Sequence, residues 1–149
     1  MKKIIKIGIL GTGRVANHYF KLFKQKKIKG SKIVGVCDVK KKKLNLAAKT
    51  YNLKIFQNLE LMLDQERPDL MIVLTPSGSH YDDVKFLLNK NFNVICEKPL
   101  AMKTHQCIDL HKIAKKKKLM LGVVFQNRLN PAIEILRKYL KDKKFGKIV

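Results

Sequence analysis

The glycine-rich turn after the first apolar run constrains the fold of this chain more than any other segment. Residues 7–16 read Ile-Gly-Ile-Leu-Gly-Thr-Gly-Arg-Val-Ala, a G-x-G-x-x-A pattern that follows a strand-like run. Gly11 permits a tight strand-to-helix turn, Gly13 lets the backbone approach a diphosphate, and Ala16 lets the helix pack closely on the sheet. Free N–H groups at the start of that helix would bind the phosphates.

The bare glycine pattern also fits an ordinary turn, so the surrounding sequence has to decide between the two interpretations. Residues 3–10 are strand-like, and residues 14–27 carry apolar side chains at roughly helical spacing. A second apolar run over 32–37 ends at Asp38, about 20 residues beyond the glycines, where an acid can accept hydrogen bonds from the adenosine ribose. Strand, glycines, helix, strand and acid follow the order of a dinucleotide-binding βαβ unit.

The same alternation of strand and helix continues along the chain with short connections. Apolar runs predict further strands at 54–56, 70–74, 93–96 and 119–125. Helical patterns separate them at 40–51, 59–65, 80–89 and 104–117, with Asn58 and Thr104 as caps. This order predicts an α/β fold with a doubly wound parallel sheet, a Rossmann fold.

One more amphipathic helix is predicted after the dinucleotide fold should be complete. It begins at Pro131 and stops near Phe145, and a β-like stretch follows at 147–149. We therefore expect a dinucleotide-binding domain over 1–125, and a linker with one extra C-terminal bridging helix over 126–149. The apolar face of this helix, from Ile133 to Leu140, should seek a partner.

Composition limits the class of protein. A chain of 149 residues, 46% of them hydrophobic, suits one folded domain, and no apolar stretch approaches the ~20 residues that span a bilayer. The basic start over 1–8 passes directly into the glycine turn, which predicts a first strand, not a signal peptide. Cys37, Cys96 and Cys107 are odd in number and lack C-x-x-C spacing, so we expect no disulfide framework, no metal site and a cytoplasmic setting.

The net charge of +22 raises the alternative of nucleic-acid binding. The chain has 29 lysines and 4 arginines, and its lysine clusters at 40–43 and 115–118 lie beside predicted helices without interleaved aromatic residues. Phosphate recognition favours arginine, and single-strand binders intersperse aromatic side chains. The lysines are typical of solvated helix faces, so we expect no specific nucleic-acid partner, although non-specific polyanion binding at low salt stays open.

Three loops should meet at the carboxyl edge of the predicted sheet, where open α/β sheets bind ligands. They are Gly11–Ala16, Thr75–His80 and Glu97–Pro99. Lys98 would close a buried strand, and a lysine partly desolvated beside a carboxylate suits proton transfer from a hydroxyl. The alternatives are an exposed ion pair at that position and an ordinary helix-cap histidine at His80.

Four motifs, in this order, resemble the glucose–fructose oxidoreductase/inositol dehydrogenase (Gfo/Idh/MocA) family. They are Gly-x-Gly-x-x-Ala at 11–16, Thr-Pro-x-x-x-His at 75–80, Glu-Lys-Pro at 97–99 and Gln-Asn-Arg-x-Asn-Pro at 126–131. Segments 75–80 and 124–132 are also similar to bacterial dehydrogenases that act at C3 of UDP-N-acetylglucosamine-derived sugars. That branch implies a role in surface-polysaccharide and lipopolysaccharide biosynthesis.

The resemblance implies an NAD-dependent oxidoreductase that passes hydride from a sugar or UDP-sugar carbon to nicotinamide. Lys98 would be the catalytic acid/base, with a cis bond to Pro99, and Lys98 and Arg128 would contact the substrate. The cofactor-binding residues that it implies are Gly11, Thr12, Gly13, Arg14, Val15, Asp38, Thr75, Ser77, His80, Glu97, Lys98 and Gln126.

The acid at Asp38 predicts NAD over NADP, since a carboxylate would repel a 2′-phosphate. Lys40 and Lys41 follow it and could pair with such a phosphate, so NADP stays the less favoured alternative.

Members of this family are considerably longer, and their second half supplies an open β-sheet that binds the sugar. We therefore expect a truncated reading frame or half of a split enzyme, which works as a homo-oligomer or with a complementing C-terminal domain. The alternative is a non-catalytic NAD-binding module that associates with a partner chain through its last helix.

Overall fold

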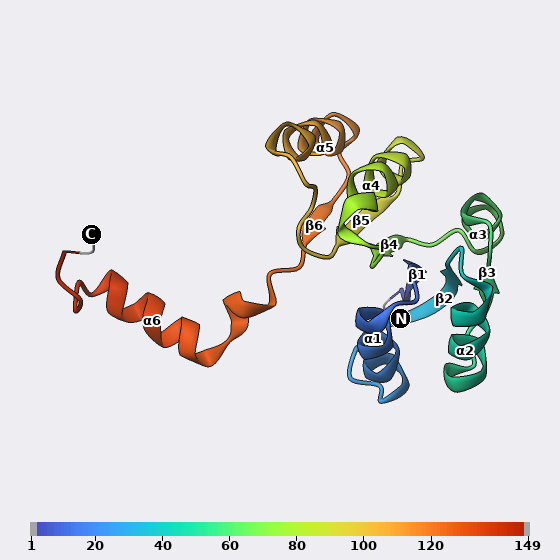
Figure 1. Ribbon diagram of the computed structural model, residues 1–149, viewed down its shortest axis with the longest axis horizontal. Coiled ribbons are helices and arrows are strands. Elements are labelled where there is room, and N and C mark those ends of the chain that lie inside the picture. Colours follow the sequence, from blue (N-terminus) through green and yellow to red (C-terminus); the bar gives the residue numbers. More distant parts are fainter. Residues whose placement is uncertain (1–2, 148–149) are drawn as a thin grey trace.

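Strands and helices alternate along the whole chain, as Figure 1 shows. The computed structural model describes residues 3–147, so all but the first residue of the β-like stretch predicted at 147–149 lies outside the described residues. The elements are β1 (Ile5–Leu10), α1 (Arg14–Lys24), β2 (Ser31–Cys37), α2 (Lys41–Tyr51), β3 (Ile55–Phe56), α3 (Leu59–Glu66), β4 (Leu70–Val73), η1 (Ser77–Ser79), α4 (His80–Asn89), β5 (Asn93–Cys96), α5 (Thr104–Lys117), β6 (Leu121–Val123), η2 (Gln126–Leu129) and α6 (Pro131–Lys141).

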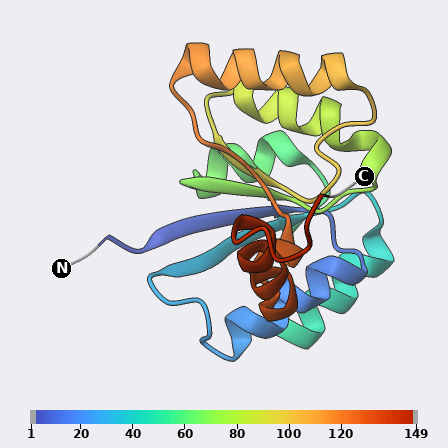
Figure 2. The same ribbon diagram turned by 90° about the vertical axis from the view of Figure 1, so that its left-hand side faces the viewer.

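The six strands form one sheet in the order β3-β2-β1-β4-β5-β6, and every pairing is parallel. Figure 2 shows α3, α4 and α5 on one face of the sheet and α1 and α2 on the other. This is the predicted doubly wound fold. The strand order reverses between β1 and β4, which in such sheets is the point where a crevice opens at the carboxyl ends of the strands.

Each face of the sheet has its own hydrophobic core. The cluster on one face includes buried residues of α3, α4 and α5, and that on the other includes Ala16 and Phe20 of α1. Strand β4 contributes to both, with Met71 and Val73 in the first cluster and Ile72 in the second. This double burial explains the continuous apolar run that predicted the strand, because a strand between two helical layers has no polar face.

Two local predictions were wrong. Helix α5 begins at Thr104 as expected, but its N-cap is Lys103, whose N–H donates to the Gln106 side chain at 3.2 Å. Strand β6 covers only Leu121–Val123, not 119–125, and is half-buried. It is shorter because it is an edge strand paired with β5 alone, and because the N–H of Met120 already bonds the Asn93 side chain at 3.0 Å.

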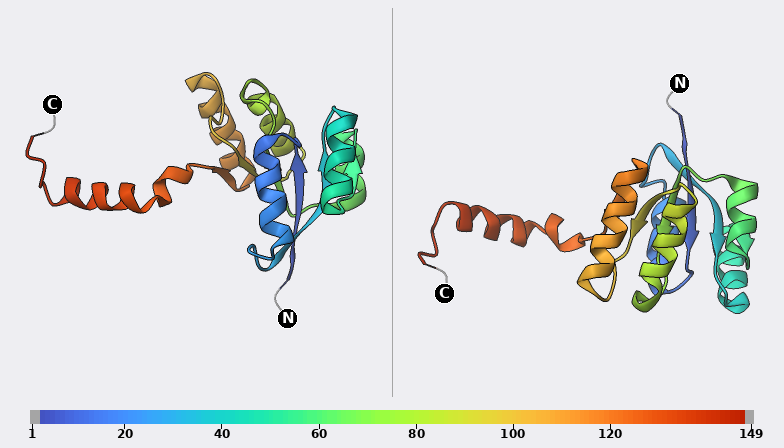
Figure 3. Two further views of the ribbon diagram at one scale, coloured as in Figure 1. Left: turned by 60° about the horizontal axis from the view of Figure 1, so that its bottom comes forward. Right: turned by 90° about the horizontal axis from the view of Figure 1, so that it is seen from above.

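Helix α6 extends away from the sheet and its helices (Figures 1 and 3). Asn130 caps it by accepting a hydrogen bond from the N–H of Ala132 at 3.0 Å, and Pro131 occupies its first turn. None of its residues is buried, and its apolar side chains, among them Tyr139 and Leu140, are exposed. The extra helix is therefore present, with its apolar face uncovered by any residue between 3 and 147. No helix in that range is long and apolar enough to cross a membrane.

Candidate cofactor-binding site

A pocket of about 500 Å³ lies at the carboxyl edge of the sheet, where the strand order reverses. It is formed by three segments: the loop between β1 and α1, the segment after β2 with the start of α2, and the segment after β4 with the start of α4. The lining residues are Leu10, Gly11, Gly13, Arg14, Val15, Asp38, Val39, Lys40, Lys43, Leu74, Thr75, Pro76, Ser79 and Asp83.

The backbone of the first loop has the geometry that the glycine pattern predicts. Gly11 has a φ of +98°, and a Cβ there would lie 2.7 Å from the carbonyl carbon and oxygen of Leu74, so no other residue fits without displacement. At Gly13 an added Cβ would meet nothing within 4 Å, because the position opens into free space. Gly13 is also the N-cap of α1 and supplies no side-chain cap. The N–H groups of the first helical turn are therefore open to an anion.

Asp38 is held in a fixed orientation beside this loop. Its Oδ2 accepts hydrogen bonds from the N–H of Thr12 at 2.8 Å and from its hydroxyl at 2.7 Å, and its Oδ1 accepts from the N–H of Lys40 at 2.8 Å. Burial alone would raise the pKa of Asp38, but these hydrogen bonds and the charge of Lys43 hold the pKa below its usual value. The carboxylate therefore stays ionised and keeps one acceptor position on Oδ1 for a ligand hydroxyl.

Thr12 orients this carboxylate and does not line the pocket with its own side chain. It is buried, and both its N–H and its hydroxyl are bonded to Asp38. The sequence pattern singled out Asp38 and the family resemblance named Thr12, but neither indicated that the two residues bind each other.

A second pair of side chains fixes the segment after β4. The hydroxyl of Thr75 donates to Oδ2 of Asp83 at 2.6 Å, and both residues line the pocket. Burial raises the pKa of Asp83, an effect that the hydrogen bond from Thr75 and the charge of His80 partly offset. Sequence reasoning missed Asp83. Its signal was an acid three residues after His80, one helical turn along the predicted helix and on the same side.

His80 joins two loops and does not line the pocket. Its side chain is 1% exposed, with Nδ1 at 2.6 Å from the carbonyl oxygen of Pro99 and Nε2 at 2.8 Å from that of Thr75. Both partners are acceptors, so both contacts are hydrogen bonds only when both ring nitrogens carry protons. The geometry therefore assigns His80 the positioning of the loops after β4 and β5.

Glu97 and Lys98 follow β5 at the neighbouring strand end. The hydroxyl of Tyr19, on α1, donates to Oε1 of Glu97 at 3.4 Å, and the N–H of Lys98 donates to Oε2 at 3.2 Å. Burial, and then the charge of Glu97, raises the pKa of Tyr19 to about 12, so the phenol remains a donor. The bond from Lys98 to Pro99 is cis, as the resemblance implied. The expected desolvation of Lys98 is absent: the side chain is exposed, because no described segment covers this strand end.

Three further predicted residues lie outside the pocket lining. Ser77 begins the 3₁₀ helix η1 and is half-buried, while Gln126 and Arg128 lie on η2, beyond the end of the sheet, and are exposed. The guanidinium carbon of Arg128 lies 5.6 Å from the ring centre of Phe125. The roles of these three residues therefore stay predictions.

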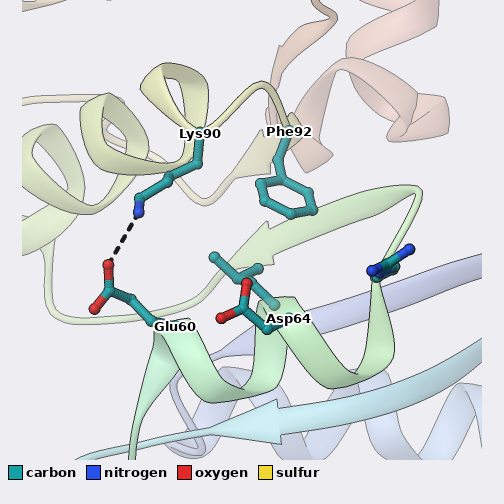
Figure 4. Close-up of a pocket in the computed structure, with 6 residues that line it drawn as sticks. Glu60, Asp64, Lys90 and Phe92 are labelled. Atoms are coloured by element: carbon teal, nitrogen blue, oxygen red, sulfur yellow. Dashed lines mark ion pairs between the residues drawn. The ribbon is translucent and has the colours of Figure 1, made fainter.

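Another pocket, of about 510 Å³, lies between α3 and the end of α4 (Figure 4). Glu60 and Lys90 form an exposed ion pair across it at 3.0 Å, with Asp64 and Phe92 nearby. Arg67, which also lines it, precedes β4, and Phe92 precedes β5, so this pocket is at the amino ends of the strands. It is therefore separate from the crevice at the carboxyl edge. Within residues 3–147 no group of three or more His, Cys, Asp or Glu side chains could hold a metal ion.

Comparison with known proteins agrees with the geometry of the pocket at the carboxyl edge of the sheet. Residues 5–125 match the model of an oxidoreductase family, Gfo/Idh/MocA, described as an NAD-binding Rossmann fold. The chain belongs to this family. NAD is accordingly its cofactor, and the tight turn at Gly11, the open space at Gly13 and the ionised Asp38 fit a dinucleotide.

Several dehydrogenases are similar to this family member. The WlbA dehydrogenase of Chromobacterium violaceum, in a crystal structure with NADH and UDP-GlcNAcA, is 32% identical with a TM-score of 0.90; the match covers 99% of this chain and 42% of that one. Glucose-6-phosphate 3-dehydrogenase of Bacillus subtilis is 26% identical over 144 residues, covering 97% of this chain and 40% of the relative. Inositol 2-dehydrogenase/D-chiro-inositol 3-dehydrogenase of Lactiplantibacillus plantarum is 27% identical over 150 residues, covering 97% and 42%. The chain thus spans about two fifths of the length of these relatives.

Proposed function

We propose that this chain is the cofactor-binding part of an NAD-dependent dehydrogenase that oxidises a hydroxyl group of a sugar or nucleotide sugar. The observation that carries this proposal is the crevice at the strand reversal, which combines a glycine turn open to a diphosphate with an ionised acid for a ribose. Sugar and inositol dehydrogenases among the relatives support the substrate class.

The finer substrate in this proposal is a UDP-N-acetylhexosamine derivative oxidised at C3, in surface-polysaccharide or lipopolysaccharide biosynthesis. It is supported by the 32% identity to the WlbA dehydrogenase, whose structure contains UDP-GlcNAcA. The segment over 124–132, which resembles enzymes of this branch, supports it as well.

The proposal divides the work among the residues of the crevice and the strand ends. The N–H groups of Gly13, Arg14 and Val15 would bind the diphosphate, and Asp38 would accept a hydrogen bond from the adenosine ribose. Bound NAD supplies the hydride acceptor. Glu97, fixed by Tyr19, would border the nicotinamide, with Thr75, Ser77 and Gln126 in further cofactor contacts.

Lys98 would accept the proton of the substrate hydroxyl at Nζ. A lysine accepts a proton only when its amine is neutral, and desolvation favours the neutral form. Because Lys98 is exposed in this chain, the proposal requires a further segment that covers the end of β5. We assign that role to the substrate-binding part of the enzyme, which Arg128 and helix α6 would join to the domain over 1–125.

A non-catalytic NAD-binding module is the second candidate function. The exposed apolar face of α6 favours it, because such a face can hold a partner whether or not chemistry follows. The two candidates differ in one observable. An enzyme forms NADH from NAD and a UDP-sugar once a complementing chain supplies the substrate-binding part, whereas a module binds NAD without turnover.

Titration of NAD into the purified chain and its Gly13→Ala and Gly13→Val variants tests the cofactor step. Each added carbon enters the open space in front of the α1 N-terminus, so the fold should persist while the diphosphate is displaced. We expect valine to weaken NAD binding at least tenfold, about 1.4 kcal/mol, and more than alanine. Circular dichroism and thermal unfolding check that the variants are folded. Unchanged affinity in a folded Gly13→Val variant would contradict the proposal.

A further inference from the structure

Asp83 is a second carboxylate in the cofactor pocket, and neither the glycine pattern nor the family motifs account for it. It lies in the first turns of α4 and lines the pocket together with Thr75 and Ser79. Asp38 and Lys40 line it from the segment after β2. A carboxylate in an anion-binding pocket opposes binding unless it contacts an uncharged donor of the ligand.

The two oxygens of Asp83 differ in their surroundings. Oδ2 accepts the hydroxyl hydrogen of Thr75 at 2.6 Å, which fixes the orientation of the carboxyl group. Within residues 3–147 no donor bonds Oδ1. The carboxyl is half-buried, and Oδ1 is not enclosed by the protein, so it remains open to a donor from water or from a ligand in the pocket. Asp83 is thus oriented by the protein and has capacity for one more donor.

The position of Asp83 relative to the other walls decides which part of a dinucleotide it meets. The diphosphate belongs at the start of α1 and the adenosine ribose at Asp38, so the base attached to that ribose extends between the segments after β2 and β4. Both segments line this pocket, whereas no residue after β5 does. In the proposed arrangement the nicotinamide would lie toward Glu97, so the adenosine half is the part of the dinucleotide that would reach Asp83.

The apolar side chains of the same pocket suit a flat ring. Val39 comes from one wall and Pro76 from the other, and both are exposed. An aromatic base between them would have its edge free for hydrogen bonding, and adenine presents an amino group there as a neutral donor.

We propose that Asp83 is a specificity-determining residue that recognises the adenine base of the cofactor, with Oδ1 accepting a hydrogen bond from the 6-amino group. This inference rests on the proposed binding of NAD in the crevice and adds a base preference to it.

Nicotinamide hypoxanthine dinucleotide is the probe that tests this contact, because a carbonyl oxygen replaces the 6-amino group of adenine and would face Oδ1, while the hypoxanthine N1–H lies one ring position away. Dissociation constants for both dinucleotides are measured with the chain as it is. The unmodified protein should bind NAD on the order of tenfold more tightly, the size of one hydrogen bond to a charged acceptor.

Two variants of equal charge change show whether Asp83 causes the preference. In Asp83→Asn the side-chain oxygen can still accept from Thr75, but the amide nitrogen can donate to the hypoxanthine carbonyl, so the preference should fall to near one or reverse. Asp82→Asn removes the same charge from the neighbouring exposed position, outside the pocket lining, and should keep the preference of the unmodified protein.

Equal affinity of the unmodified protein for both dinucleotides would overturn the inference and leave NAD binding intact. The inference would also be overturned if Asp83→Asn weakened both ligands equally, since Asp83 would then only support the loop through Thr75. If neither dinucleotide bound, the cofactor step of the proposed function would fail, and the base preference with it. Thermal unfolding of each variant confirms that the ratios are measured on folded protein.

Discussion

Helices α1 and α6 have the same length and opposite surroundings. Each has 11 residues and one apolar face, yet α1 buries Ala16 and Phe20 against the sheet whereas α6 buries none of its residues. Phe20 is 1% exposed, and Tyr139, at the corresponding apolar face of α6, is 40% exposed. Amphipathic spacing therefore predicts that an apolar face exists, but it does not tell what covers that face. The apolar face of α1 is packed against the sheet, whereas that of α6 is exposed within residues 3–147.

The largest expected effect is a difference in the free energy of unfolding between a substitution on α1 and one on α6. Phe20→Ala removes a fully buried ring and should lower the free energy of unfolding by about 3–5 kcal/mol. Tyr139→Ala removes a half-exposed ring that contacts Phe145, at 5.9 Å between centres, and Lys144, whose Nζ lies 4.8 Å from the ring centre. It should change the free energy of unfolding by less than about 0.5 kcal/mol. Urea unfolding followed by circular dichroism measures both. A comparable loss for Tyr139→Ala would mean that α6 packs against the domain or against a second copy.

Lys98 lies at the border between the covered and uncovered regions. In the complete enzyme, Lys98→Ala should lower turnover by about 10²–10⁴-fold, the usual contribution of a general base. NAD affinity should change little, because Lys98 does not line the cofactor pocket. Steady-state NADH formation and NAD titration measure the two effects. Undiminished turnover would remove Lys98 from the mechanism.

The thiols give a smaller contrast within the packed region. Burial and nearby carboxylates raise the pKa of Cys37 to about 11 and that of Cys96 to about 12, so few thiolates form at pH 8. Relative to an unperturbed thiol with a pKa near 8.5, both should react at least about a hundredfold more slowly with an aromatic disulfide reagent. Cys107, which is only half-buried, should react first. Mass spectrometry of the labelled chain identifies the order, and early labelling of Cys96 would show that the strand end opens readily.

The smallest expected effect concerns the carboxylate of Asp38, which follows β2 and lies beside the loop between β1 and α1. Asp38 has a lowered pKa in the folded chain, so its hydrogen bonds with Thr12 and Lys40 contribute stability above the unfolded pKa of about 3.9. That contribution is lost only as the pH falls through the lowered folded value. The stability difference between the unmodified protein and Asp38→Asn should therefore be constant from pH 7 to about pH 4 and then close. Denaturation at stepwise pH measures it, and closure already near pH 5 would mean that the carboxylate is not held as described.

Local patterns were enough for most of the fold. The continuous apolar run at 70–74 and the helical spacing over 80–89 predicted β4 and α4 closely, because burial on both faces or on one stripe is written in consecutive residues. Asn58 was also recognised as a cap, and its side chain accepts from the N–H of Leu61 at 2.9 Å. The error in β6 arose because apolar character does not show where an edge strand loses its partner.

The site was predictable in its backbone and less so in its side chains. The glycine turn could be predicted because its backbone geometry requires glycine: at Gly11 a φ of +98° and the close approach to Leu74 exclude other residues. The hydrogen bond between Thr12 and Asp38 joins residues 26 positions apart in the sequence. The orientation of Asp83 likewise depends on a hydrogen bond from Thr75, which lies on the preceding loop. Such contacts depend on how loops converge in space, and no periodicity along the chain records them.

The imidazole of His80 acts as a crossbar between two stretches of chain that carry different parts of the proposed chemistry. One of its ends rests on Thr75, which orients the carboxyl proposed to sense the base, and the other rests on Pro99, the neighbour of the proposed proton acceptor. Because the imidazole ring is rigid, the distance between its two nitrogens fixes the separation of the two loops. A longer or more flexible side chain at position 80 would let the two loops separate, although His80 itself does not line the cofactor pocket.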